Sequence, residues 1–438
     1  MVDVAYINIW GKRGGAVAWD NARQYATIEF AESFIREGID LAPIIMPLSE
    51  LLRGTKIYSF PNLSKQTFNG LPGILADSLP DRYGNRLINE WLAIRGKSIE
   101  DFNIVDRLCY IGKRGMGALE FEPAIRGAMN DSVIIEIEEL VSLAKKVLNQ
   151  RKEMNLKLSR NYKEAVQEII RVGTSAGGAR AKAVIALNEN TGEIRSGQVD
   201  APEGFTHWIL KFDGVSDEVL GQTTGFGRIE YAYYKMAADA GINMEECRLL
   251  EESGRAHFMT RRFDRLKGNK KIHMQTLCAV AHFDYNDPVS YSYEQLFQVM
   301  RKMKLPYTDF DQMFRRMVFN AAACNYDDHT KNVSFLLTQN DQWRLSPAYD
   351  VIYSHNPSGI WTKRHQMSVN GKRENIEYKD LVSAGKENNI KSAADIISEV
   401  IGAISNWKKY GASAGVSEER IKEIKKNLKI KDFLKKSG

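Results

Sequence analysis

The chain has 438 residues, of which 43% are hydrophobic and 26% charged, and it contains only 11 prolines. This is an ordinary globular composition, which excludes extended disorder, collagen-like repeats and low-complexity structure. At about 150 residues per domain, the length predicts two or three domains. Lys and Arg number 61 against 55 Asp and Glu, and this net charge of +6 permits contact with nucleic acid without predicting it.

The cysteine pattern and the hydropathy indicate a compartment. The four cysteines lie far apart in apolar or helical contexts, which is typical of buried reduced thiols in a cytosolic protein. The N-terminal sequence MVDVAYINIW places Asp3 in a short apolar run, unlike a signal peptide. No uncharged apolar run approaches the ~18 residues of a membrane-spanning helix. We therefore expect a cytoplasmic protein with no membrane partner.

The first third of the chain predicts a small α+β domain. Residues 4–10 alternate between two faces, which predicts a strand. Residues 71–92 begin with Pro and Gly and continue as a helix. The predicted buried stripe of that helix is Leu87, Ile88, Trp91 and Leu92. Glycines then punctuate a loop before the strand-like ALEF, and we place the end of this domain at about residue 125.

The rest of the chain predicts a second α+β region and a helical one. Residues 131–150 are predicted to form a helix capped near Asp131 or Ser132, followed by a helix at 162–171. We place an N-lobe region at 126–265 and a mainly helical C-lobe at 266–438. The predicted elements of the N-lobe after Gly173 are strands at 183–187 and 207–212, a helix at 228–240, and a strand pair at 246–251 and 256–263.

The C-terminal end is strongly basic. Residues 420–438 carry eight Lys and Arg against two acids, with apolar residues interleaved. This predicts an amphipathic surface helix with a basic end. A contact with nucleic acid or a protein partner is the alternative.

A loop rich in small residues runs from Gly173 into the apolar strand 183-AVIAL-187. Backbone N–H groups of such a loop can approach phosphate oxygens, and Lys182 could add a charge. The loop is not a Walker A motif, because Ala179 and Arg180 stand where Lys and Ser or Thr are needed. A plain connection between helix and strand is the alternative. The candidate nucleotide-binding residues of the loop are Ala176, Gly177, Gly178 and Ala179.

Two further segments suit nucleotide binding. Lys211 lies in the short apolar strand after the loop, where protein kinases carry the lysine that reaches nucleotide phosphates. A gatekeeper lysine on an edge strand is the alternative. Glu230 on the following helix is a possible ion-pair partner of Lys211, or a surface partner of a basic residue on its own helix. Residues 261–265 end a strand where a kinase hinge would bind adenine, with Arg261 and Phe263 as candidate contacts; a core Phe is an equal alternative for Phe263.

The segment 325-NYDDHTKN-332 is the strongest candidate for the catalytic residues. Phosphoryl transfer needs a carboxylate to accept the substrate hydroxyl proton, and an amide and a carboxylate to hold Mg²⁺. Asp327 and Asn332 are five residues apart, the spacing of the kinase catalytic loop. The next two strands return the chain to Asp350, the position of a metal-binding carboxylate. We therefore predict Asp327 as the catalytic base and Asn332 and Asp350 as metal ligands.

Neighbouring residues of this segment remain open. Asp328 is the alternative base, because a shift of one residue would exchange the two carboxylates. His329 is a candidate catalytic residue that is expected to orient the loop by hydrogen bonding. Lys331 is a candidate for neutralising the transferred phosphate. A solvated loop without chemistry is the alternative for the segment as a whole.

Taken together, these motifs resemble the HipA family of serine/threonine kinases, the toxins of HipBA-type toxin–antitoxin pairs. The resemblance covers nearly the whole chain. The segments that carry it occur in the family's order: 71-LPGILADSLPDRYGNRL-87, 111-IGKRGMGALEFEP-123, 175-SAGGARAK-182, 257-HFMTRRFDR-265, 325-NYDDHTKN-332, 347-PAYDV-351 and 366-QMSVNGK-372.

The resemblance implies an α+β, bilobed, protein-kinase-like fold that uses ATP and Mg²⁺. It implies that Lys211 binds ATP phosphates and that Ser175, with Thr174 as a competitor, is autophosphorylated and thereby silences the kinase. It further implies a small helix-turn-helix antitoxin, operator DNA reached through that antitoxin, and an aminoacyl-tRNA synthetase as the kind of substrate. Arg180-Ala181 in the loop and Arg261 in the hinge depart from the family's pattern, and neither departure removes a catalytic group. A catalytically silent scaffold for an antitoxin and a small-molecule kinase are the rival functions.

Overall fold

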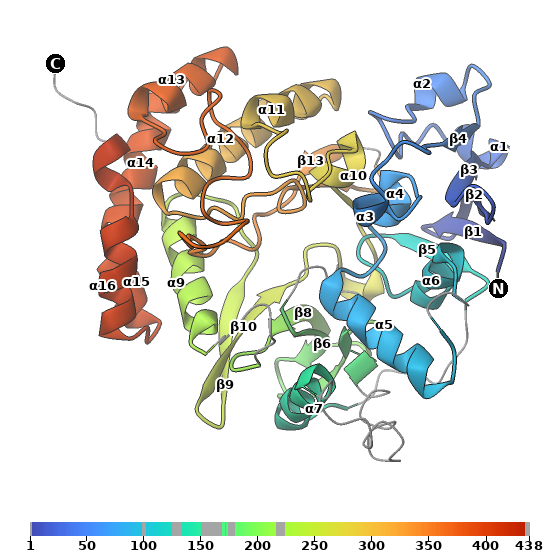
Figure 1. The fold of residues 1–438 in the computed structure, drawn as a ribbon, viewed down its shortest axis with the longest axis horizontal. Helices are drawn as coiled ribbons and strands as arrows, with labels where there is room; N and C mark the ends of the chain where they lie inside the picture. Colours follow the sequence, from blue (N-terminus) through green and yellow to red (C-terminus); the bar gives the residue numbers. More distant parts are fainter. Residues whose placement is uncertain are drawn as a thin grey trace. The chain divides into compact units, whose positions relative to one another are not determined.

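The computed structural model describes residues 2–98, 102–124, 134–149, 169–170, 172–173, 180–215, 224–340 and 342–433. Helices and sheets are mixed throughout, as the predicted α+β class requires (Figure 1). The chain forms two compact units. The first comprises Met1–Ala42, Met46–Gly227 and Arg248–Met274, and the second Pro43–Ile45, Arg228–Cys247 and Gln275–Gly438. The division into three domains stays a prediction.

An antiparallel five-stranded sheet with the strand order β4-β3-β2-β1-β5 begins the first unit. Along β1 the side chains of Ala5, Ile7 and Ile9 are buried while the intervening ones are not, so the predicted strand and its faces are confirmed. The strands are β1 (Val4–Ile9), β2 (Lys12–Asp20), β3 (Tyr25–Phe30), β4 (Ile57–Ser59) and β5 (Leu119–Glu122).

Six helices of the described residues lie in the chain between strands of this sheet, and two of them are well specified by sequence. Helix α5 buries the predicted stripe on one face. Helix α6 starts at a capping box, in which the Asn103 side chain accepts from the Asp106 N–H and the Asp106 carboxylate accepts from the Asn103 N–H. The helices are α1 (Glu32–Ile35), α2 (Leu48–Leu51), α3 (Lys65–Phe68), α4 (Gly73–Ala76), α5 (Arg82–Ile94) and α6 (Ile104–Ile111).

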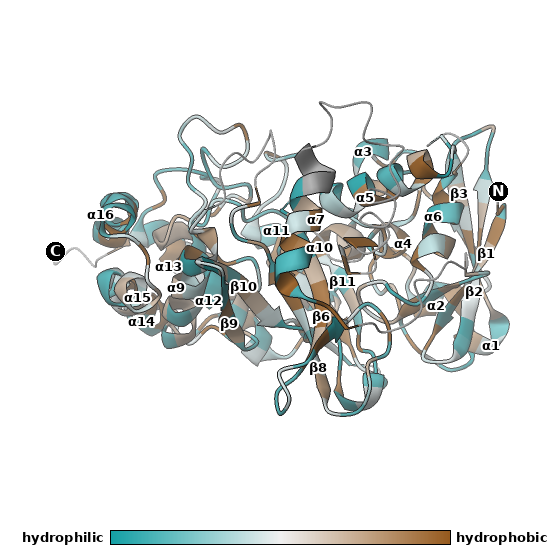
Figure 2. Ribbon diagram, turned by 90° about the horizontal axis from the view of Figure 1, so that it is seen from below, coloured by the Kyte–Doolittle hydropathy of each residue, from teal (hydrophilic) through white to brown (hydrophobic). Residues whose placement is uncertain are grey.

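A second five-stranded sheet, in the order β7-β6-β8-β10-β9, completes the first unit. Strands β6 and β8 are its hydrophobic centre (Figure 2). Their inward side chains share one core with helix α5. The predicted strands and the predicted helix therefore stabilise each other by packing. The strands are β6 (Lys182–Asn188), β7 (Ile194–Ser196), β8 (Phe205–Lys211), β9 (Cys247–Glu252) and β10 (Arg255–Arg261).

Helix α7 corrects one prediction. It runs over Ile137–Asn149 instead of starting after a cap at Asp131 or Ser132. The physical reason is that Ile134 extends as a bridge to Arg195, and an extended residue cannot belong to the first turn of a helix. The predicted helix at 162–171 falls mostly outside the described residues.

Helices dominate the second unit. Helix α12 is its central element, with Phe314, Met317 and Phe319 completely buried. A three-stranded sheet, in the order β11-β12-β13, includes the predicted hairpin that follows the catalytic segment. The helices are α9 (Phe226–Asp239), α10 (Leu277–Ala281), α11 (Tyr293–Lys302), α12 (Tyr307–Ala322), α13 (Tyr378–Glu387), α14 (Ala393–Ser405), α15 (Trp407–Ser413) and α16 (Glu418–Asn427), and the strands are β11 (His273–Thr276), β12 (Ser334–Leu337) and β13 (Trp343–Leu345).

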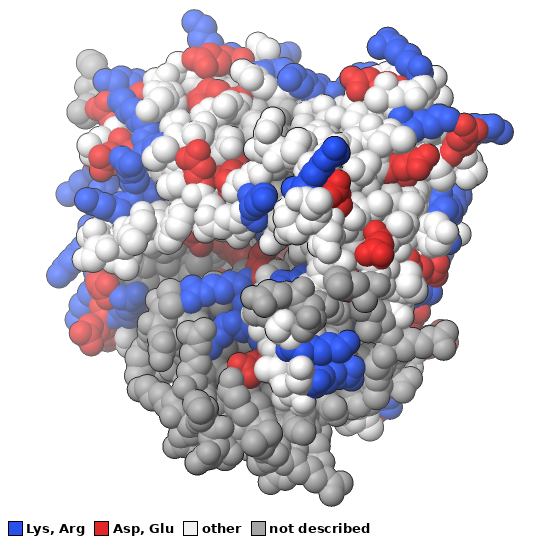
Figure 3. Space-filling model, turned by 45° about the vertical axis from the view of Figure 1, so that its right-hand side comes forward, with Lys and Arg blue, Asp and Glu red and all other residues white. Residues whose placement is uncertain are grey.

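The basic C-terminal end is amphipathic, as predicted. Ile421 and Ile424 of α16 and Phe433 of a short 3₁₀ helix, Ile430–Phe433, are buried, while Lys425 and Lys426 are exposed. On the face drawn in Figure 3, basic and acidic side chains are interspersed. None of the helices in the described residues is both long and apolar enough to cross a membrane.

Candidate functional site

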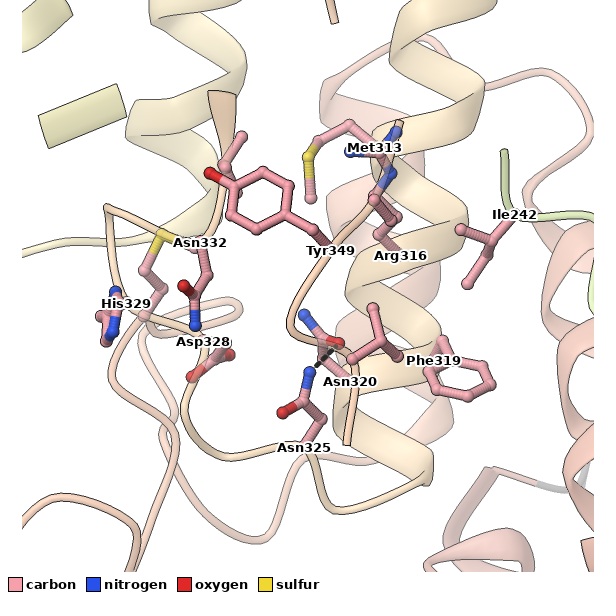
Figure 4. Close-up of a pocket in the computed structure, with 14 residues that line it drawn as sticks. Ile242, Met313, Arg316, Phe319, Asn320, Asn325, Asp328, His329, Asn332 and Tyr349 are labelled. Atoms are coloured by element: carbon pink, nitrogen blue, oxygen red, sulfur yellow. Dashed lines mark hydrogen bonds between the residues drawn. The ribbon is translucent and has the colours of Figure 1, made fainter. Parts of the chain in front are cut away.

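The predicted catalytic segment forms a loop between α12 and β12. Helix α12 ends at Ala322, and Cys324 takes a left-handed conformation with φ of 56°, which turns the chain out of the helix. The Asn325 side chain then donates a 2.9 Å hydrogen bond back to Oδ1 of Asn320 (Figure 4). Thr330 donates its hydroxyl to the carbonyl of Phe283, and its own carbonyl accepts the N–H of Cys278. The loop is therefore fixed at both ends.

The structure separates the two adjacent carboxylates. Asp328 is 2% exposed. Its oxygens accept from the Tyr293 hydroxyl at 2.9 Å and from the backbone N–H of Gln366 at 2.8 Å, and Oδ2 lies 2.8 Å from Nδ1 of His365. Asp327 is 44% exposed at its side chain, and its Oδ1 accepts one hydrogen bond, from the side chain of Gln366. Of the two carboxylates, Asp327 is therefore the one that another molecule can reach.

Asn332 is oriented by the same loop. Its Nδ2 donates a 2.7 Å hydrogen bond to the backbone carbonyl of Asp327, and its own N–H donates to the carbonyl of His329. Because a carbonyl can only accept, this bond fixes which way the amide points and turns Oδ1 away from it. An amide oxygen and nearby carboxylates are donors that Mg²⁺ accepts. The residue type and orientation of Asn332 therefore fit the predicted metal site.

His329 and Lys331 take part in the local structure of the loop. Nδ1 of His329 accepts the backbone N–H of Lys331 at 3.2 Å, and its Nε2 is 3.9 Å from Oδ1 of Asp327. The ammonium of Lys331 lies 4.6 Å from the centre of the Tyr285 ring, within the range of a cation–π contact. The predicted orienting position of His329 thus agrees with its hydrogen bond, and both catalytic roles stay predictions.

Asp350 follows the β12–β13 hairpin, as the sequence predicts. It adopts φ of 52°, a left-handed conformation that Asp tolerates better than most residues. The preceding residue, Tyr349, donates its hydroxyl at 2.6 Å to the backbone carbonyl of Lys331. This bond ties the segment that carries Asp350 to the candidate catalytic loop.

A pocket lies on the α12 side of the loop (Figure 4). Asp328, His329 and Asn332 contribute to its wall, whereas Asp327 and Asp350 do not. Arg316 of α12 is buried at this pocket and donates to the carbonyl of Ser346; burial lowers the pKa of its guanidinium to about 10. The pocket is thus a cavity beneath the catalytic loop, and the exposed carboxylate lies outside it.

The predicted phosphate-binding lysines lie in the first unit. Lys182 and Lys211 are cross-strand partners on β6 and β8. Lys182 is 3% exposed, whereas Lys211 is half-buried with its ammonium 5.6 Å from the centre of the Phe258 ring. Ser175 and the loop residues Ala176, Gly177, Gly178 and Ala179 lie outside the described residues. Glu230 belongs to the second unit, and its pairing with Lys211 stays a prediction.

The predicted hinge contains a charged network that the sequence analysis missed. Arg261 is exposed at the end of β10 and Phe263 is half-buried. Asp264, the residue after Phe263, is completely buried. Its carboxylate accepts two hydrogen bonds from Arg262, at 2.7 and 2.8 Å, and one from Arg265, at 2.7 Å. Burial alone would raise the pKa of Asp264, but the two guanidinium charges and the hydrogen bonds outweigh burial and hold it well below its ordinary value.

This network also forms hydrogen bonds to the glycine loop that precedes β5. Asp264 accepts the N–H of Gly117 at 2.8 Å, and Arg265 donates to the carbonyls of Gly115 and Gly117. Gly117 has φ of 72°, and a Cβ there would lie 2.9 Å from the backbone nitrogen of Met274, so glycine is required. The close spacing of three Arg and one Asp in 261-RRFDR-265 was the available signal for this network.

Two family models match the chain. Residues 5–122 match the HipA N-terminal domain, and residues 174–408 match the HipA-like C-terminal domain. A search of the curated proteins gives no match.

Solved structures are also similar. One is a chain of the Shewanella oneidensis MR-1 toxin–antitoxin complex of HipA, HipB and operator DNA, with a TM-score of 0.68 and 16% identity over 98% of this chain and 96% of that one. The Helicobacter pylori proinflammatory kinase CtkA aligns with 52% of this chain and 89% of its own length, at 13% identity and a TM-score of 0.31, which is too low to support an argument. The family assignment rests on the two domain models, which match in order and together span most of the sequence: this chain belongs to the HipA toxin family.

Proposed function

We propose that this protein is an ATP- and Mg²⁺-dependent serine/threonine protein kinase of the HipA toxin type. The observation that carries the proposal is the contrast inside the catalytic loop. Asp327 is an exposed carboxylate in a loop whose backbone is fixed, and Asn332, five residues later, is oriented by the Asp327 carbonyl. This arrangement suits phosphoryl transfer, in which the protein mainly positions groups and supplies electrostatic stabilisation.

In the proposed reaction, Asp327 accepts the proton of a Ser or Thr hydroxyl. The hydroxyl oxygen forms a bond to the γ-phosphorus of ATP while the bond to the β-γ bridging oxygen breaks and ADP leaves. Asn332 and Asp350 would hold Mg²⁺, which would neutralise phosphate charge when bound. Lys331 offsets charge on the transferred group. His329 keeps the loop in place.

Nucleotide binding is proposed for residues of the first unit. Lys211, with Lys182, is assigned to the phosphates of ATP, and Arg261 and Phe263 to the adenine end. The loop residues Ala176, Gly177, Gly178 and Ala179 are assigned to the phosphates through their backbone N–H groups. Phosphorylation of Ser175 would place a dianion beside the phosphates of ATP, and like-charge repulsion would then oppose nucleotide binding and silence the kinase.

The proposed partners follow from the family. The similar Shewanella oneidensis chain comes from a complex of HipA, HipB and operator DNA, which supports a small helix-turn-helix antitoxin and, through it, DNA as partners. We propose a component of translation, such as an aminoacyl-tRNA synthetase, as the protein substrate, and the cytoplasm as the place of action.

The proposal is tested by measuring intact mass and mapping phosphopeptides after incubation of the purified protein with Mg-ATP, beside an Asp327→Asn control. Phosphate on Ser175 in the parent protein alone is the expected result. Phosphate on both proteins would mean that another kinase added it and would remove Asp327 from its role. No phosphate on either, with ATP binding retained, would favour a catalytically silent partner of an antitoxin in a DNA-bound repressor complex.

A further inference from the structure

One buried residue from a distant part of the chain contacts both carboxylates of the candidate catalytic loop. Gln366 lies 39 residues after Asp327 and is 3% exposed. Its Nε2 donates a 2.8 Å hydrogen bond to Oδ1 of Asp327, and its backbone N–H donates a 2.8 Å bond to Oδ1 of Asp328. A single residue thus fixes the inner carboxylate by its backbone and the outer one by its side chain.

The backbone of Gln366 is held on both sides of the residue. Arg373 donates to the backbone carbonyl of Gln366 and also, at 2.9 Å, to the carbonyl of Tyr291. The preceding residue, His365, contacts Asp328 through its side chain, and its backbone N–H donates to the carbonyl of Arg373. The backbone that carries the Gln366 side chain is therefore fixed by the surrounding structure before any substrate binds.

The direction of the Gln366 amide is informative. Its Oε1 is buried without a hydrogen-bond partner, an arrangement that costs free energy. If the amide were reversed, Oε1 would face the carboxylate of Asp327 and lone pairs would repel. The donor is thus directed at Asp327 although the other end of the amide is left unsatisfied, as expected for a group whose task is to hold that carboxylate.

We infer that Gln366 is a positioning residue for phosphoryl transfer, which fixes the carboxylate of Asp327 toward the acceptor hydroxyl. The inference rests on the proposed kinase function. Gln366 bonds to one oxygen of a partly exposed carboxylate, which leaves the other oxygen to meet the hydroxyl and restricts rotation of the side chain. A small displacement of a reacting group from its productive position lowers the rate of reaction without changing nucleotide affinity.

The test compares Gln366→Met, which keeps the volume and removes the donor, with Gln366→Glu, which replaces the donor with an acceptor. Both variants keep the two backbone bonds of residue 366. Val369→Ala is the matched control, because Val369 is 1% exposed on the same segment and contacts neither carboxylate through a hydrogen bond. The measurement is the rate of phosphate incorporation into the dephosphorylated full-length protein, by intact mass, across a range of Mg-ATP concentrations, together with Tm.

We expect Gln366→Met to lower kcat by about tenfold to a hundredfold with KM for ATP within about twofold. Gln366→Glu should be at least as slow, because its carboxylate repels Asp327. Val369→Ala should lower Tm and keep the parent kcat. In an Asp327→Asn background, Gln366→Met should cause little further loss, since the group that it positions is gone.

The outcomes separate the two proposals. A parent protein that incorporates no phosphate removes the kinase function itself. An active parent with Gln366→Met at the parent rate overturns only the positioning role. The positioning role also fails if Gln366→Met and Val369→Ala lose rate in proportion to their losses in Tm, because that pattern reports packing alone.

Discussion

Asp327 and Asp328 are adjacent in the chain, yet Asp328 is 2% exposed with three hydrogen-bonding neighbours while the side chain of Asp327 is 44% exposed. The inner carboxylate holds together segments that are distant in sequence, namely Tyr293, His365 and Gln366. The outer one stays accessible to another molecule. The two residues should therefore respond differently to the same substitution.

We expect Asp327→Asn to lower the rate of phosphate transfer by about a hundredfold or more, because an amide cannot accept the hydroxyl proton. Its Tm should stay close to that of the parent, since the side chain is partly exposed. Asp328→Asn should instead lower stability by about 2–4 kcal/mol, because buried donors lose a charged acceptor. Phosphorylation assays and thermal unfolding of both variants check this, and the reverse pattern would exchange the roles of the two carboxylates.

Asp350 offers a test of the metal site. Asp350→Asn should raise the Mg²⁺ concentration needed for half-maximal activity by about tenfold or more, because a neutral amide binds Mg²⁺ more weakly than a carboxylate. Asn is the suitable replacement, since it tolerates the left-handed backbone that Asp350 adopts. Glu374→Gln, at an exposed acidic residue, is the matched control. An unchanged Mg²⁺ dependence in Asp350→Asn would exclude this carboxylate as a ligand.

The buried network around Asp264 should govern stability. Asp264→Asn leaves Arg262 and Arg265 buried without their counter-charge, and we expect a loss of about 3–5 kcal/mol. The pKa of Asp264 is held below its ordinary value, so its contribution is present above pH ~4 and is lost as the pH falls through the folded-state pKa. Urea unfolding of Asp264→Asn beside the exposed Asp200→Asn at neutral pH checks the prediction. Equal stability of the two variants would contradict it.

A buried histidine should make the fold sensitive to acid. His273 is 1% exposed, and burial lowers its pKa from 6.5 to about 3. The unfolded chain therefore binds a proton between those values that the folded protein refuses, so stability falls as the pH decreases through this window. Relative to His273→Gln, the parent should lose up to about 2 kcal/mol of unfolding free energy between pH 7 and pH 5. A difference between the two proteins that does not change with pH would show that His273 is not responsible.

Several features could be predicted from the sequence because local patterns specify them. The alternation of β1, the buried stripe of α5 and the hairpin of β12 and β13 each depend on residues within one or two turns or strands. The spacing of Asp327 and Asn332 is likewise local, and the bond between the Asn332 side chain and the Asp327 carbonyl spans only five residues. The predicted start of α7 was wrong because Ile134, just before the helix, forms a bridge to Arg195, which is distant in sequence.

The sequence by itself determined the order of the elements, the position of the candidate catalytic segment and the resemblance that the family models confirmed. Only the tertiary structure decided which of two adjacent carboxylates is exposed, that Gln366 holds Asp327, and that Asp264 grips Gly117 from 147 residues away. The reason is physical. Hydrogen bonds between distant segments are stronger where burial reduces competition from water, and burial depends on segments that the chain brings together in space.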